Sequence, residues 1–131
     1  MSKSTILYVE DDEFSRDVME LIFDDMPEYE LIVFEDSRDF EAKLKQLPKL
    51  SLVLLDIHME PDDGFTMLKI IRQHGDYATL PVLALTASVM SEEITQLRES
   101  GFNGAIAKPI DQDFFAGSLA DALAGKLVWT I

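Results

Sequence analysis

Two groups of acidic residues in the 131-residue sequence each follow a short apolar run. Glu10 and Asp11 come directly after the run ILYV, and Asp56 comes directly after the run LVLL. Carboxylates that meet at one point repel each other, so such a cluster needs either a proton or a cation. No second His or Cys lies near His58 in the sequence, so an all-oxygen ligand set favours a hard ion, Mg²⁺ in particular.

A hydroxyl and an amine follow two further apolar runs. Thr86 comes after VLAL, and Lys108 comes after AIA. A phosphoryl group carries spread negative charge, which cations and hydrogen-bond donors must meet. Each residue alone has a plainer interpretation, since acids cap helices, a Thr bonds to nearby backbone and a Lys is usually solvated. Their joint position after apolar runs is therefore what indicates phosphoryl transfer onto a carboxylate.

The elements that would position these residues alternate regularly. Five apolar runs favour strands, and they lie at residues 6–9, 31–34, 52–55, 82–85 and 105–107. Between and after them, apolar residues recur at helical spacing. Strands that alternate with helices form a parallel sheet, because the crossover helix lets successive strands run the same way. Ligands bind beyond the carboxyl ends of such strands, where the acids, Thr86 and Lys108 would converge.

Composition excludes several classes of function. With 25 acidic and 11 basic residues, the net charge of -14 repels nucleic acid and anionic lipid alike. The chain contains no cysteine, so disulfides and thiolate chemistry are absent. Neither a signal peptide nor a membrane span is evident, which predicts a soluble, cytoplasmic protein. The length suits one domain.

Four motifs, taken in order, resemble the receiver domain of two-component response regulators. They are ILYVEDDEFSR, LVLLDIHMEPDDG, PVLALTA and GFNGAIAKPI, and the match extends from about Ile6 to Leu123. The resemblance implies a flavodoxin-like α/β fold: a five-stranded parallel sheet in the order 2-1-3-4-5, with five helices on its two faces. It also implies a receiver domain over residues 1–125 and a C-terminal tail over residues 126–131.

The resemblance further implies roles for individual residues. Asp56 would be the phosphoacceptor, taking its phosphoryl group from a phosphohistidine of a histidine kinase or a histidine phosphotransfer protein. Mg²⁺ would be held by Asp11, by Glu10 through water, by Asp56 and by the backbone carbonyl of His58. Thr86 and Lys108 would meet the phosphoryl group on Asp56, and the peptide between Lys108 and the next residue, a proline, would be cis.

Two departures from the family pattern are present. A proline commonly follows the Met of the motif LVLLDIHMEPDDG, but here Glu60 follows Met59 and the proline comes at Pro61. Ala105 fills the position, three before the Lys, where an aromatic switch residue is usual. A ring that swings inward behind the Thr hydroxyl therefore cannot act from that position.

Two other classes of protein share the architecture. A flavodoxin-type binding module needs a glycine- and hydroxyl-rich phosphate loop after its first strand, but EDDE there would repel phosphate. A Mg²⁺-dependent phosphohydrolase with Asp56 as nucleophile would need a general acid two positions later, where His58 stands. The favoured prediction is a phosphoacceptor that catalyses its own phosphorylation and dephosphorylation, and is not otherwise an enzyme.

The tail KLVWTI contains Leu127, Val128, Trp129 and Ile131. We expect it to fold back onto the domain. The alternative is a contact with a downstream protein target or a second copy in a homodimer, because exposed patches of Trp and aliphatic residues often mark interfaces. A change in oligomer size with concentration would distinguish these two interpretations of the tail. Turnover of a phosphate ester would distinguish the phosphohydrolase from the phosphoacceptor.

Overall fold

A parallel sheet of six strands, in the order β2-β1-β3-β4-β5-β6, runs through the middle of the protein. The computed structural model describes residues 3–88 and 90–130. The strands are β1 (Ser4–Val9), β2 (Tyr29–Phe34), β3 (Leu52–Asp56), β4 (Val82–Thr86), β5 (Gly104–Ala107) and β6 (Val128–Thr130). The helices are α1 (Glu13–Asp24), α2 (Phe40–Lys45), α3 (Gly64–Arg72), α4 (Ser91–Ser100) and α5 (Gln112–Leu123), with a 3₁₀ turn at Tyr77–Thr79.

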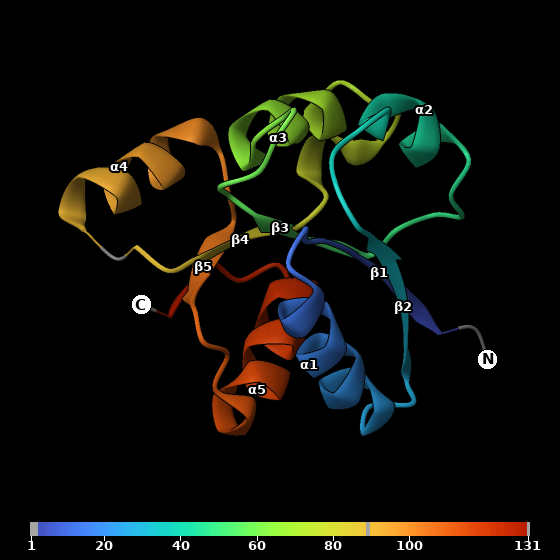
Figure 1. The fold of residues 1–131 in the computed structure, drawn as a ribbon, viewed down its shortest axis with the longest axis vertical. Helices are drawn as coiled ribbons and strands as arrows, with labels where there is room; N and C mark the ends of the chain where they lie inside the picture. The colour runs from blue at the N-terminus through green and yellow to red at the C-terminus, as the bar shows by residue number, and fades with distance from the viewer. Residues whose placement is uncertain (1–2, 89, 131) are drawn as a thin grey trace.

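Helices cover both faces of the sheet. Helices α1 and α5 lie on one face and α2, α3 and α4 on the other (Figure 1). Every residue of β3 and β4 is buried, as expected for strands that are covered on both sides. Alternation along the strands divides the core, so that Val53 and Leu55 pack with the α2–α4 layer while Leu52 and Leu54 pack with the α1–α5 layer.

The predicted parallel α/β fold with five helices is confirmed, but the predicted number of strands is wrong. A sixth strand in the tail, β6, pairs in parallel with β5, and Val128 N–H donates to the Asn103 carbonyl at 2.9 Å. Gly104 permits this approach, because a Cβ there would overlap the Val128 carbonyl. At three residues, β6 is too short for an apolar pattern to reveal it.

The tail thus folds back onto the domain, as expected, while Ile131 lies outside the described residues. No helix in the described part of the chain is long and apolar enough to cross a lipid bilayer.

Candidate functional site

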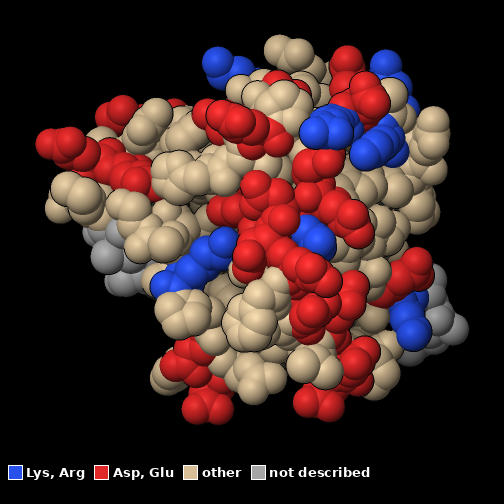
Figure 2. All heavy atoms as spheres, viewed as in Figure 1, with Lys and Arg blue, Asp and Glu red and all other residues tan. Residues whose placement is uncertain are grey.

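The carboxyl ends of four adjacent strands bring the predicted site residues together. Asp56 is the last residue of β3 and Thr86 the last of β4, while Glu10 and Lys108 follow β1 and β5 directly. The parallel register keeps these ends level, since Lys108 N–H donates to the Thr86 carbonyl at 2.8 Å. Convergence on one edge, which the sequence predicted, is what the structure shows. Acidic side chains gather across the middle of this view, between the two helix layers (Figure 2).

Three carboxylates form a compact acidic cluster. One oxygen from each of Glu10, Asp11 and Asp56 lies within 4.8 Å of the other two. Glu10 is fully buried and Asp56 is 7% exposed, whereas Asp11 is open to solvent. Oxygen ligands in this arrangement suit a hard divalent cation with waters completing its shell. The donor set therefore fits the Mg²⁺ that the sequence indicated.

Lys108 provides the positive charge of the cluster. Its Nζ lies 2.8 Å from Glu10 Oε1 and 3.6 Å from Asp56 Oδ1. Tyr8, which the sequence analysis missed, donates its hydroxyl to the same Glu10 oxygen at 3.0 Å. The available signal was spacing, because Tyr8 stands two residues before Glu10 and strand residues two apart share a face. Glu10 is therefore held in place by two donors.

Burial and mutual repulsion perturb the carboxyl groups of this cluster. Burial, with the hydrogen bond and negative charge of Glu10, raises the pKa of Asp56 to about 7, although Lys108 opposes the rise. Burial would also raise the pKa of Glu10, but hydrogen bonds with Asp56 and Lys108 hold it below its usual range. A positive charge at this position, such as that of a cation, would relieve the repulsion that raises the pKa of Asp56.

Thr86 is tied to a different set of partners. Its hydroxyl is buried and lies 3.0 Å from Glu93 Oε1 and 3.1 Å from the Ser88 carbonyl, and it accepts the Ser88 N–H at 3.0 Å. No hydrogen bond joins it to Asp56 or Lys108 among the described residues. The sequence analysis missed Glu93, because its partnership with Thr86 depends on how α4 approaches the sheet.

The His58 side chain lies outside the acidic cluster. It is 69% exposed, and its Nε2 lies 3.3 Å from the Glu93 Oε1 that also accepts from Thr86. In this position the imidazole is directed to α4 and is no general acid beside Asp56. The predicted role of the His58 backbone carbonyl is independent of the side chain and stays a prediction.

Two further acids near the site, Asp12 and Asp63, cap helices. Asp12 caps α1 by accepting the Ser15 N–H at 2.9 Å, and Asp63 caps α3 by accepting the Thr66 N–H at 2.9 Å. The peptide bond between Glu60 and Pro61, where the sequence departs from the family, is cis, as is the predicted bond between Lys108 and Pro109.

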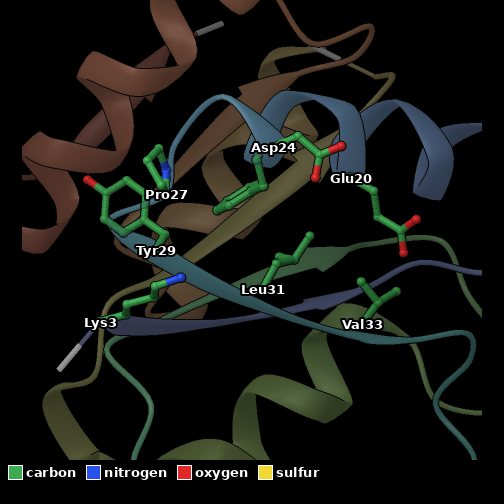
Figure 3. Close-up of a pocket in the computed structure, with 8 residues that line it drawn as sticks. Lys3, Glu20, Asp24, Pro27, Tyr29, Leu31 and Val33 are labelled. Atoms are coloured by element: carbon green, nitrogen blue, oxygen red, sulfur yellow. The ribbon is translucent and has the colours of Figure 1, made fainter.

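One hollow among the described residues lies away from this site. It has a volume of about 480 Å³ and lies between α1 and β2, where Leu31 and Val33 of the edge strand face Glu20 and Asp24 of the helix (Figure 3). It contains none of the clustered residues, so the chemistry indicated by the strand ends does not involve it.

Comparisons with known proteins agree with a parallel α/β domain that has an acidic site at its strand ends. The model of the response regulator receiver domain family matches residues 6–119. An uncharacterised 14.6 kDa protein from Leptolyngbya boryana is 30% identical over 111 residues, which cover 85% of this chain and 83% of the relative. The sensor histidine kinase RcsC of Salmonella typhimurium is 37% identical over 71 residues, which cover 54% of this chain and 7% of the kinase.

Solved structures show the same fold. One is the receiver domain of the sensor histidine kinase PA1611 from Pseudomonas aeruginosa, crystallised with a magnesium ion in its active-site cleft. It has a TM-score of 0.83 at 21% identity, with 94% of this chain and 99% of that chain covered.

The chain therefore belongs to the response regulator receiver domain family. It is a phosphoacceptor domain of two-component signalling.

Proposed function

We propose that Asp56 is the phosphoacceptor of this receiver domain. The observation that carries the proposal is the position of Asp56, which ends the central strand β3 with the Glu10 and Asp11 carboxylates beside it and Lys108 Nζ at 3.6 Å. A nucleophile next to a cation site and an amine is what phosphoryl transfer requires, because the protein's contribution is mainly positioning and charge stabilisation.

We propose that the donor is a phosphohistidine on a histidine kinase or a histidine phosphotransfer protein. A carboxylate oxygen of Asp56 attacks phosphorus, the new O–P bond forms as the N–P bond breaks, and the imidazole keeps the electron pair. Lys108 then pairs with a phosphoryl oxygen, and the Thr86 hydroxyl donates to another. The similarity of this chain to segments of sensor histidine kinases supports this class of donor.

The cation site is proposed to consist of Glu10, Asp11, Asp56 and the backbone carbonyl of His58. Mg²⁺, when bound, supplies charge neutralisation at the transferring phosphoryl group. Its carboxylate donors are the cluster described above, and the magnesium in the PA1611 receiver domain supports the assignment.

Water later attacks phosphorus and releases the Asp56 carboxylate and phosphate, so the domain limits its own signal. The output is proposed to pass through contact with a downstream protein target or with a second copy in a homodimer.

The proposal is tested by labelling with a small phosphodonor. We expect acetyl phosphate with Mg²⁺ to phosphorylate the wild-type chain, and Asp56→Asn to abolish labelling because the amide is a poor nucleophile. Intact mass measures the product. Asp62→Asn is the matched control, because Asp62 lies in the following loop with its N–H bonded to Ser37 and its side chain outside the acidic cluster. Full labelling of Asp56→Asn would refute Asp56 as the phosphoacceptor. Equal labelling with EDTA in place of Mg²⁺ would refute the proposed cation site.

A further inference from the structure

The Thr86 hydroxyl is already fully engaged where the structure describes it. It accepts the Ser88 N–H, and its single proton is shared between the Ser88 carbonyl at 3.1 Å and Glu93 Oε1 at 3.0 Å. A hydroxyl has one proton to donate. If it is to donate to a phosphoryl oxygen on Asp56, Thr86 has to give up both of these acceptors.

Glu93 is the stronger of the two acceptors. A carboxylate accepts a shorter and stronger hydrogen bond than a neutral carbonyl does, and the Glu93 side chain is only 19% exposed. Glu93 lies in the first turn of α4. The bond therefore joins the end of the central sheet to the helix that follows it.

We propose that Glu93 is a positioning residue that holds the Thr86 hydroxyl away from Asp56 in the unphosphorylated protein and loses it on phosphorylation, which releases the first turn of α4. This inference rests on the proposed function of Asp56. His58 keeps a contact with Glu93 on its solvent side, so the carboxylate has a partner after Thr86 leaves.

The consequence for α4 depends on the residues that replace the usual aromatic switch. Ala105 is fully buried and pairs with Trp129 of β6, and neighbouring residues in register point to the same face of a sheet. The Arg98 guanidinium of α4 lies 4.4 Å from the centre of the Trp129 ring. Helix α4 is therefore joined to Thr86 near its beginning and to Trp129 near its end.

The experiment compares the rate of labelling by acetyl phosphate in Mg²⁺ among variants of the full chain. Glu93→Ala leaves Thr86 only the weaker Ser88 carbonyl to give up, so we expect labelling to be about three- to tenfold faster than in the wild type. Glu93→Gln keeps a neutral acceptor and should fall between the two, at about twofold. Glu92→Ala is the matched control: it removes the same charge from the same turn of α4, and should label at the wild-type rate.

A double-mutant cycle separates positioning from a general effect on folding. In a Thr86→Val background the hydroxyl is absent, so Glu93→Ala should no longer accelerate labelling. Fluorescence of Trp129, the chain's one tryptophan, should change on phosphorylation of the wild type and already be shifted in unphosphorylated Glu93→Ala.

Three results would overturn the inference while leaving the proposed function standing. They are equal rates for Glu93→Ala and wild type, equal acceleration by Glu92→Ala, and acceleration that persists with Thr86→Val. If Glu93→Ala does not fold, the near-isosteric Glu93→Gln decides by the same cycle. Failure of the wild-type chain to be labelled at all would instead refute the proposed function, and this inference with it.

Discussion

Two groups of side chains lie beside Asp56, and they differ in charge and in burial. On one side, Lys108 and Tyr8 hold the buried Glu10 carboxylate at 2.8 Å and 3.0 Å. On the other side, Thr86 bonds to Glu93, whose outer partner, His58, is 69% exposed. The first region is a buried group of charges, and the second is a hydroxyl with a partly solvated pair.

The difference indicates how the two regions can serve one site. Charges in a poorly solvated setting interact strongly, and the loss of one partner leaves an uncompensated ion. Such a region resists rearrangement, and Lys108 has further N–H donors that can pair with a phosphoryl oxygen on Asp56 while it stays bonded to Glu10. A hydrogen bond from the Thr86 hydroxyl to one charged acceptor, Glu93, can be exchanged for a bond to another, a phosphoryl oxygen, at little net cost. The Glu10–Lys108 side therefore provides fixed electrostatics, while the Thr86–Glu93 side can switch.

The largest effect should come from Lys108→Met. This change leaves the buried Glu10 carboxylate without its ion pair, so we expect the free energy of unfolding in EDTA to fall by about 3 kcal/mol. Urea denaturation at neutral pH measures it. Mg²⁺ should restore part of the loss, because the cation supplies positive charge to the same carboxylates.

The matched control for that change is Lys126→Met. Its ion pair with Asp121 spans 3.8 Å between side chains that are 69% and 56% exposed, and exposed pairs of this kind contribute about 0–1 kcal/mol. Equal losses of stability in the two variants would show that burial does not distinguish the Glu10–Lys108 region.

A smaller effect is expected from pH. The pKa of Asp56 is raised to about 7 by burial and by Glu10, so the folded state holds this proton more tightly than the unfolded chain does. The resulting stability is complete at acidic pH below the unfolded value and is lost as pH rises through the folded pKa. Between about pH 6 and about pH 8 in EDTA, the wild type should lose about 1 kcal/mol relative to Asp56→Asn.

Taking the difference between these two proteins cancels the titration of groups that they share. Urea denaturation of both across the pH series provides the measurement. A constant difference would show that Asp56 has an ordinary pKa and that the acidic cluster is less strained than its geometry indicates.

These regions also differ in how far the sequence predicted them. Glu10, Asp56 and Lys108 follow apolar runs, and a parallel sheet brings such strand ends together whatever the loops do. The partner of Thr86 was not predictable in the same way. Glu93 reaches it only because the first turn of α4 lies beside the end of β4, and nothing in the spacing of a solvated acid marks that approach.

The same limit explains the missed strand. The five predicted strands are long enough to show an apolar pattern. Strand β6 instead depends on Gly104, which admits the Val128 carbonyl, and on pairing with β5, from which helix α5 separates it in the sequence. Tertiary contact, and not local preference, decides its conformation.

The smallest effect should come from His58→Asn, which sharpens the contrast between the two sides of Asp56. The change removes the exposed contact with Glu93 and keeps the backbone carbonyl, so we expect a loss of at most about 0.5 kcal/mol and unchanged binding of Mg²⁺. Salt screens buried charges less than exposed ones, so 1 M NaCl should leave most of the loss caused by Lys108→Met. Urea denaturation with and without salt tests both statements. A loss as large as that of Lys108→Met would mean that the Thr86–Glu93–His58 side is as fixed as its counterpart, and exchange of the Thr86 hydroxyl would then be too costly to act as a switch.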